Sequence, residues 1–219
     1  MSMMDEMVLP VRPMSLRDTI LFGESFLSKH FPAMLTTPQA LDVERLVDEV
    51  LPSEGARVYG DAHLVNYGVT RFADADDSVE ILMRVNLYDA LFDANDRNRV
   101  FAISTLVHET GHALRHMPQF RPAHLQAKEL GRRQNFEHAL HRRAHLKAYE
   151  DPEWQAHAIG GVLVAPPSAI RRLPQHSVPE LAQVFGVSIP NMKAHMKRLV
   201  GQGLINTRPP IDPKGGLMR

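Results

Sequence analysis

The chain has 219 residues, no cysteine and a formal net charge of zero, and hydrophobic residues make up 44% of it. This composition is typical of a globular protein, and the lack of cysteine excludes disulfides and thiolate metal ligands. Charge is unevenly spread, because residues 168–219 hold eight basic and two acidic residues, a net charge of +6, which leaves −6 for residues 1–167. We therefore expect two parts, a domain over residues 1–167 and a basic module over residues 168–219.

Two features bear on location. No apolar run approaches the roughly 20 residues that a membrane span needs. The first six residues, MSMMDE, are acidic and lack the basic and then apolar pattern of a secretory signal. We expect a cytoplasmic protein without a membrane partner.

In chain order, hydrophobic periodicity predicts a helix over residues 15–30, stopped by Pro32, and another from about Pro38 to Val50. Residues 65–73 and 79–87 are rich in strand-forming residues, and the turn residues between them predict a hairpin. The fold class expected from these elements and from the helices that follow is α+β, mainly helical with a small antiparallel sheet.

The pentapeptide His108-Glu-Thr-Gly-His112 is the first motif that points to chemistry. Apolar residues at helical spacing surround it, Asp96 is the expected N-cap, and Pro118 predicts a helix end near His116. On a helix, residues four apart share a face, so His108 and His112 could bind one zinc ion. Glu109 would then stand beside the metal as general base. The alternative is a buried helix whose two histidines cap carbonyl groups.

A catalytic zinc site needs a third protein ligand from another element, because His116 lies in the same helical row as the other two histidines. Asp151, Pro152 and Glu153 have the residue types of a helix start. The helix that follows carries small residues on one side, Ala156 and Gly160 among them, which would let it pack closely on the motif helix near Gly111. Glu153 would then face the zinc. Its alternative role is to favour the helix dipole in the first turn.

These two segments together resemble the ImmA/IrrE family of zinc metallopeptidases. That family has a His-Glu-x-Gly-His helix followed by Glu-x-(Glu/Gln)-Ala-(Asn/Asp)-x-Phe-Ala-x-x-Leu-Leu-x-Pro. The chain matches the second pattern at Glu153, Gln155, Ala156, Leu163 and Pro166. The resemblance implies a zincin-like domain with one Zn²⁺ per chain, bound by His108, His112 and Glu153. It also implies a protein substrate, a helix-turn-helix transcriptional repressor cleaved in a stress or mobile-element response.

The chain departs from the family pattern at several places. His157 stands where the family has Asn or Asp, so it could support a ligand histidine or reach the metal itself. The segment between His112 and Glu153 is long, and it contains a row of histidines three and four residues apart. We interpret this row as one face of a solvated basic helix, with a second metal site as the alternative: His138, His141 and His145.

The basic module resembles a helix-turn-helix. Its first helix would close at Gly186, and Ser188 would cap a second helix over residues 189–200. Basic side chains on that helix could meet phosphate, while only Asn191 and His195 are suited to reading base edges. The basic side chains are Lys193, Lys197 and Arg198. We favour docking of a protein or a structural role over DNA contact.

Two functions follow. The first is a cytoplasmic zinc endopeptidase in which Glu109 is catalytic and strand 79–87 offers an edge to an extended substrate. Candidates for a second oxyanion donor are Tyr59, His63 and Tyr149. The alternative is a regulator that binds DNA or protein and whose zinc site is structural or inactive.

Overall fold

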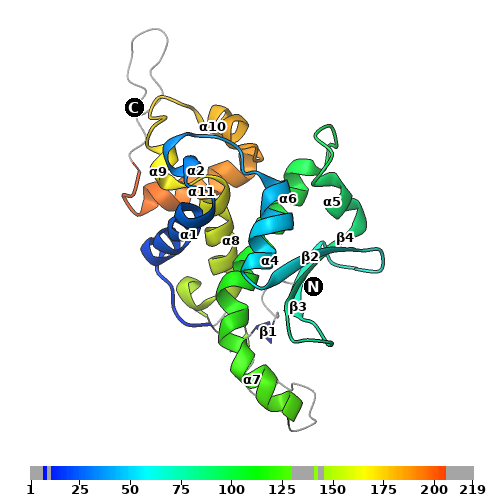
Figure 1. The fold of residues 1–219 in the computed structure, drawn as a ribbon. Helices are drawn as coiled ribbons and strands as arrows, with labels where there is room; N and C mark the ends of the chain where they lie inside the picture. The colour runs from blue at the N-terminus through cyan, green and yellow to red at the C-terminus, as the bar shows by residue number, and fades with distance from the viewer. Residues whose placement is uncertain (1–6, 9–10, 130–140, 143–145, 206–219) are drawn as a thin grey trace, which may run out of the picture. The chain divides into compact units, whose positions relative to one another are not determined.

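The computed structural model describes residues 7–8, 11–129, 141–142 and 146–205. It is an α+β structure that is mostly helical and has a small three-stranded sheet (Figure 1). The chain divides into two compact units, one made of residues 1–19 and 42–160, the other of residues 20–41 and 161–219. The expected boundary at residue 167 stays a prediction. None of the helices among the described residues combines the length and the apolar character that a membrane crossing requires.

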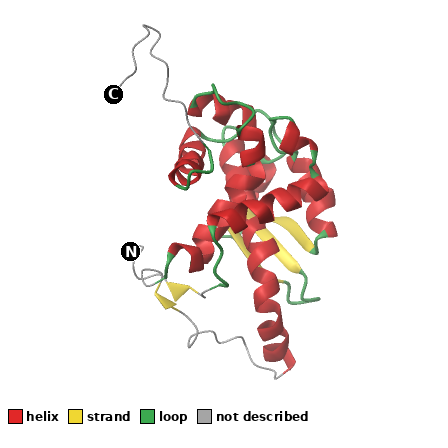
Figure 2. Ribbon diagram, turned by 90° about the vertical axis from the view of Figure 1, so that its left-hand side faces the viewer, coloured by secondary structure: helices red, strands yellow, loops and turns green. Residues whose placement is uncertain are grey.

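The sheet of the first unit, whose strands are yellow in Figure 2, has the order β2-β4-β3. The expected hairpin is confirmed, because β3 (Gly68–Phe72) and β4 (Val79–Arg84) pair antiparallel. The sheet as a whole is mixed and not antiparallel as expected, since β2 (Ala56–Asp61) pairs parallel with β4. Only two side chains of β2 are buried, Ala56 and Val58, so the strand carries a weak hydrophobic pattern.

The central place of β4 corrects a second expectation. Strand 79–87 was expected to offer a free edge, but β4 is bonded on both sides and the chain turns into α5 (Val85–Ala90) directly after it. The burial of β4 on both faces explains why its sequence is almost continuously apolar. Among the described strands, β2 and β3 form the edges of this sheet.

A helical segment precedes the sheet and is only partly as expected. It begins at Val43 and not at Pro38, because the Asp42 carboxylate accepts a hydrogen bond from the Arg45 amide and caps it there. The segment continues past Pro52 and consists of three consecutive helical pieces. These are α3 (Val43–Arg45), the π-helical turn η2 (Leu46–Val50) and α4 (Leu51–Ser53).

The helix that carries the motif is longer than expected. α6 (Arg99–Gly111) begins after Asn98, while Asp96 accepts a hydrogen bond from the Asn98 amide in the preceding turn. The prediction of an end near His116 is wrong. A π-helical turn, η3 (His112–His116), leads into α7 (Met117–Glu129). A π turn widens the helix and shifts its hydrogen bonds by one residue, which makes room for Pro118, a residue without an amide hydrogen.

The helix expected after Asp151 is confirmed as α8 (Pro152–Val164). A 3-10 turn, η6 (Ala148–Glu150), precedes it and holds the N-terminal segment, since Val11 and Met14 amides donate to the Glu150 and Tyr149 carbonyls. The remaining described strands form a short antiparallel pair, β1 (Met7–Val8) and β5 (His141–Arg142).

The second unit is helical. The predicted helix over residues 15–30 is confirmed as α1 (Leu16–His30), and α2 (Ala33–Thr36) and α9 (Pro167–Ile170) are short additional helices. The two expected tail helices are present as α10 (Val178–Phe185) and α11 (Ile189–Gly201). Gly186 ends the first of them with a φ of 64°, and Ser188 caps the second.

Candidate metal centre

His108 and His112 lie on adjacent turns of the motif helix and present the same ring atom to each other. Their Nε2 atoms are 3.2 Å apart, and the two rings meet edge to face. Both side chains are only partly accessible, at 15% and 17% of their surface. The helical spacing therefore brings the two histidines together as the sequence predicted.

Glu153 reaches this pair from α8. Its backbone amide donates to the Asp151 carboxylate, so the expected N-cap fixes the first turn of the helix. Its carboxylate lies 3.1 Å from His108 Nε2 and 3.2 Å from His112 Nε2, through different oxygen atoms. Glu153 thus meets two histidines that lie 45 and 41 residues before it in the sequence.

Glycine allows the two helices to come this close. A Cβ built on Gly111 would lie 3.0 Å from Ala156 Cα and 3.1 Å from the Ala156 carbonyl oxygen. One built on Gly160 would lie 3.2 Å from the backbone of Val107. Both contacts are with backbone, which cannot move aside as a flexible side chain can. The small residues on α6 and α8 therefore set the distance at which Glu153 meets the histidines.

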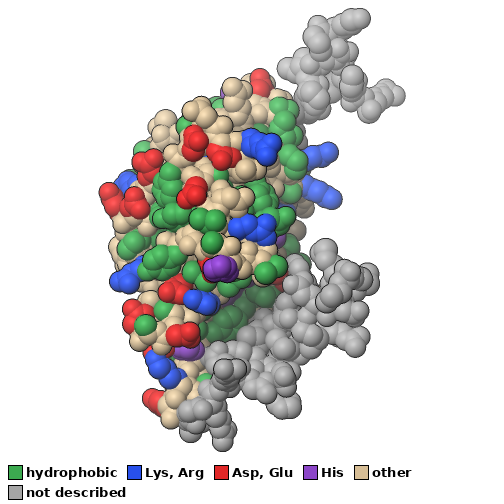
Figure 3. All heavy atoms as spheres, turned by 90° about the vertical axis from the view of Figure 1, so that its right-hand side faces the viewer, with side chains coloured by type: hydrophobic (Ala, Val, Ile, Leu, Met, Phe, Trp, Pro, Cys, Tyr) green, Lys and Arg blue, Asp and Glu red, His purple; other side chains and the backbone are tan. Residues whose placement is uncertain are grey.

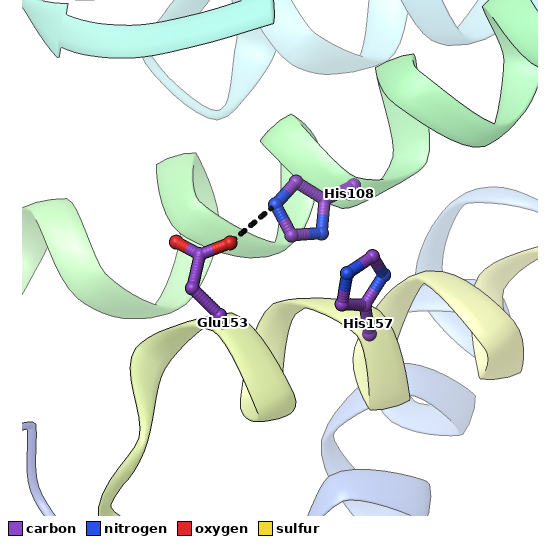
Figure 4. A group of neighbouring side chains, drawn as sticks. All are labelled: His108, Glu153 and His157. Atoms are coloured by element: carbon purple, nitrogen blue, oxygen red, sulfur yellow. Dashed lines mark ion pairs between the residues drawn. The ribbon is translucent and has the colours of Figure 1, made fainter. Parts of the chain in front are cut away.

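His157 also belongs to the cluster. It lies one turn beyond Glu153 on α8, and its ring centroid is 4.2 Å from that of His108 (Figure 4). His108, Glu153 and His157 form a group that could hold a metal ion, with ligand atoms within 4.8 Å of one another. His108, Glu153 and His112 form a second group, in which the ligand atoms lie closer together.

Distances favour His112 over His157 as the third ligand. Zinc holds nitrogen and oxygen ligands at about 2.0–2.2 Å in a tetrahedron, so two ligand atoms lie about 3.3–3.6 Å apart. The separations among His108, His112 and Glu153 are 3.1–3.2 Å, close to such an edge. The residues present therefore fit a zinc ion.

The electrostatics of Glu153 support the same point. Burial raises the pKa of its carboxyl group, but the neighbouring imidazole groups of His108 and His112 lower it more, and the net pKa is well below its usual range. Glu153 is therefore a carboxylate at neutral pH. An anion packed against two imidazole nitrogens in a partly buried site attracts a cation.

Glu109 stands apart from the three ligand candidates. Its carboxylate accepts a hydrogen bond of 2.7 Å from the Thr70 hydroxyl on β3, and the side chain is 8% exposed. A Cβ on Gly68 would lie 2.8 Å from Glu109 Cγ, so this strand approaches the motif helix closely. The carboxylate is thus held by the edge of the sheet.

A chain of hydrogen bonds leads from His112 into the interior. His112 Nδ1 is 3.0 Å from His116 Nδ1, and His116 Nε2 is 3.2 Å from Gln155 Oε1. Burial and, to a lesser extent, the nearby His112 lower the pKa of His116 to about 3, so its imidazole is neutral at neutral pH. Both ring nitrogens of His116 face other side chains, which leaves neither for a metal and agrees with its place in the helical row.

The candidate oxyanion donors are scattered. Tyr59 lies on β2, two strands away from β3, and His63 lies in the turn after β2. Tyr149 lies four residues before Glu153, in the 3-10 turn that precedes α8. All three stay predictions. The histidine row at His138, His141 and His145 falls outside the residues whose side chains the structure describes.

In the second unit, one expected base-reading residue is excluded. His195 is 3% exposed, and its Nε2 donates to the Ala165 carbonyl at 2.9 Å. It belongs to the core of this unit, where Gly161 makes room for its ring. Asn191, Lys193 and Lys197 are exposed. Acidic and basic side chains both occur on the face of the molecule that Figure 3 draws.

Sequence reasoning missed Thr70 and the partnership of His116 with Gln155. One available signal was Gly68, because a glycine inside a strand often marks the close approach of another element.

Comparisons of the chain with protein-family models, with curated proteins and with solved structures give no match.

Proposed function

We propose that the chain is a zinc-dependent endopeptidase with one Zn²⁺ bound by His108, His112 and Glu153. The observation that supports this most is the set of three separations of 3.1–3.2 Å among the donor atoms of these residues. Two histidines and one glutamate are also a ligand set that leaves a fourth position for water in catalytic zinc sites. The resemblance to the ImmA/IrrE family supports the same ligands.

Glu109 is the proposed general base. When bound, zinc would polarise a water molecule and the scissile carbonyl group. Glu109 takes a proton from the attacking water and passes it to the leaving amine. Thr70 keeps the carboxylate oriented through its 2.7 Å hydrogen bond. His108, His112 and Glu153 take no part in proton transfer in this scheme.

The substrate would run along β3. This strand lies at an edge of the sheet, and its residues Gly68 and Thr70 contact Glu109. An extended peptide that pairs with such an edge passes the general base with its backbone held by hydrogen bonds. β3 thus takes the place of strand 79–87 as the edge to which the substrate would add. The resemblance favours a helix-turn-helix repressor as substrate, in a cytoplasmic stress or mobile-element response.

The test is a comparison of the zinc-loaded protein with its Glu109→Gln variant on a proteome-derived peptide mixture, followed by capture of new N-termini. We expect new termini with the wild-type protein only. Zinc content must be equal in both, because Gln is nearly isosteric and Glu109 is not a proposed ligand. New termini in equal yield from both proteins would contradict the role of Glu109.

A second function is favoured by one observation, the position of His157. If His157 joined the other three residues, zinc would have four protein ligands, as in structural sites. The chain would then be a regulator that binds protein or DNA through α10 and α11. Charge reversal at Lys193, Lys197 and Arg198 distinguishes the two. It abolishes function in cells if the chain is such a regulator, whereas Glu109→Gln abolishes it if the chain is a peptidase.

A further inference from the structure

Gln155 is a buried amide whose orientation is fixed by its surroundings. It has no exposed surface, and its Nε2 lies 3.0 Å from the Arg12 carbonyl and 2.8 Å from the Tyr149 carbonyl. Carbonyl oxygens only accept hydrogen bonds, so the amide nitrogen must face both of them. Its Oε1, an acceptor, is thereby turned toward His116 at 3.2 Å.

This orientation sets the proton on His116. A ring nitrogen that faces an acceptor must donate, so Nε2 of His116 carries the hydrogen. A neutral imidazole has one donor and one acceptor, which leaves His116 Nδ1 as the acceptor. That atom lies 3.0 Å from His112 Nδ1. His112 must therefore donate from Nδ1.

We propose that Gln155 and His116 are positioning residues that hold the proton of His112 on Nδ1, so that its Nε2 lone pair faces His108 and Glu153. The inference rests on the proposed metal site, since Nε2 is the atom offered to the metal. It assigns a task to two buried polar side chains, 0% and 1% exposed, that no part of the proposed reaction uses.

His108 provides a contrast within the same site. Its Nδ1 is buried and has no hydrogen-bond partner among the described residues. A buried donor without a partner is costly, so the surroundings do not favour a proton on that atom. Of the two motif histidines, only His112 is thus held ready to bind a metal through Nε2. The hydrogen-bond relay that holds it runs from Gln155 through His116, and both residues lie outside the pentapeptide.

The direct test is nuclear magnetic resonance of the 15N-labelled full-length protein, both metal-free and with added zinc. Scalar coupling across the hydrogen bond should join His112 Nδ1 and His116 Nδ1, with the proton bonded to His112. A proton bonded to His116 Nδ1, or no coupling, overturns the proposal. This readout does not need zinc to bind, so failure of the proposed metal site and failure of the relay are distinguishable.

A second test measures zinc affinity by competition with a chelator. Gln155→Leu removes the acceptor of the relay, and we expect affinity to fall about 10- to 100-fold, the usual effect of losing a residue that orients a ligand. Gln119→Leu is the matched control. Gln119 also contacts Arg12, through the Arg12 amide, but its amide nitrogen donates to the Arg115 carbonyl. Equal losses of affinity in the two variants would contradict a role specific to Gln155.

Discussion

The hydroxyl group of Thr70 lies 2.7 Å from Glu109 Oε2, across 39 residues of sequence. The same hydroxyl is 3.1 Å from the Glu109 backbone carbonyl, so an edge strand and the motif helix meet at this residue. The contact holds the proposed general base on the side of the sheet where an extended peptide could pair.

Thr70→Val tests this contact. Hydrogen bonds to charged groups contribute about 1.5–3 kcal/mol, so we expect a loss of about 10- to 100-fold in kcat/KM on a peptide found by terminus capture. Zinc content should not change. Thr105→Val is the control, because Thr105 lies one turn before Glu109 and its hydroxyl donates to the Phe101 carbonyl of its own helix. An active Thr70→Val variant would show that Glu109 needs no such support.

Gly111→Ala tests the close packing of α6 on α8. The added methyl group would lie 3.0 Å from Ala156 Cα, and backbone on both sides prevents relaxation. We expect the free energy of unfolding to fall by about 1–3 kcal/mol, and zinc affinity to fall because Glu153 is pushed away from the histidines. Denaturant unfolding and chelator competition measure these effects.

Gly201→Ala is the control for that variant. A Cβ at Gly201 would meet no atom within 4 Å, so its substitution should leave stability unchanged or slightly raised. If Gly111→Ala were as stable as Gly201→Ala and bound zinc normally, α6 and α8 would not lie at the close distance described above.

The buried histidines predict acid sensitivity. Burial lowers the pKa of His116 to about 3 and of His195 to about 4, with the nearby His112 and Arg198 adding to the effect. In the unfolded chain histidine titrates near 6.5. The unfolded state therefore binds more protons below that pH, so stability is complete above about pH 6.5 and declines as pH falls toward the folded values.

Denaturant unfolding of the metal-free protein between pH 7 and pH 5 measures this decline. Each histidine contributes a slope that approaches about 1.4 kcal/mol per pH unit below its unfolded pKa. Constant stability over this range would contradict the neutral, buried state of the two histidines.

Local patterns in the sequence foretold the parts of the site that are set by neighbours along the chain. The spacing of His108 and His112 and the cap at Asp151 act within one or two helical turns, and the structure contains both. The small residues of α8 indicated close packing, and the structure brings Ala156 against Gly111. Glu153 could be placed beside the histidines because close helix packing leaves few arrangements.

Other parts depend on tertiary contacts that periodicity does not encode. Proline normally ends a helix, but the π turn before Pro118 lets it continue into α7. β2 is stabilised by pairing with β4 more than by its own apolar residues, so it was missed. Thr70 and Gln155 act through partners 39 residues away, and no local rule points to either.

The most direct test of the metal centre is a zinc titration of the metal-free protein and of two variants, His112→Ala and His157→Ala. We expect one zinc per chain in the wild-type protein, loss of tight binding in His112→Ala, and retention of one zinc in His157→Ala. No zinc in the wild-type protein, or loss of zinc in His157→Ala but not in His112→Ala, would contradict it.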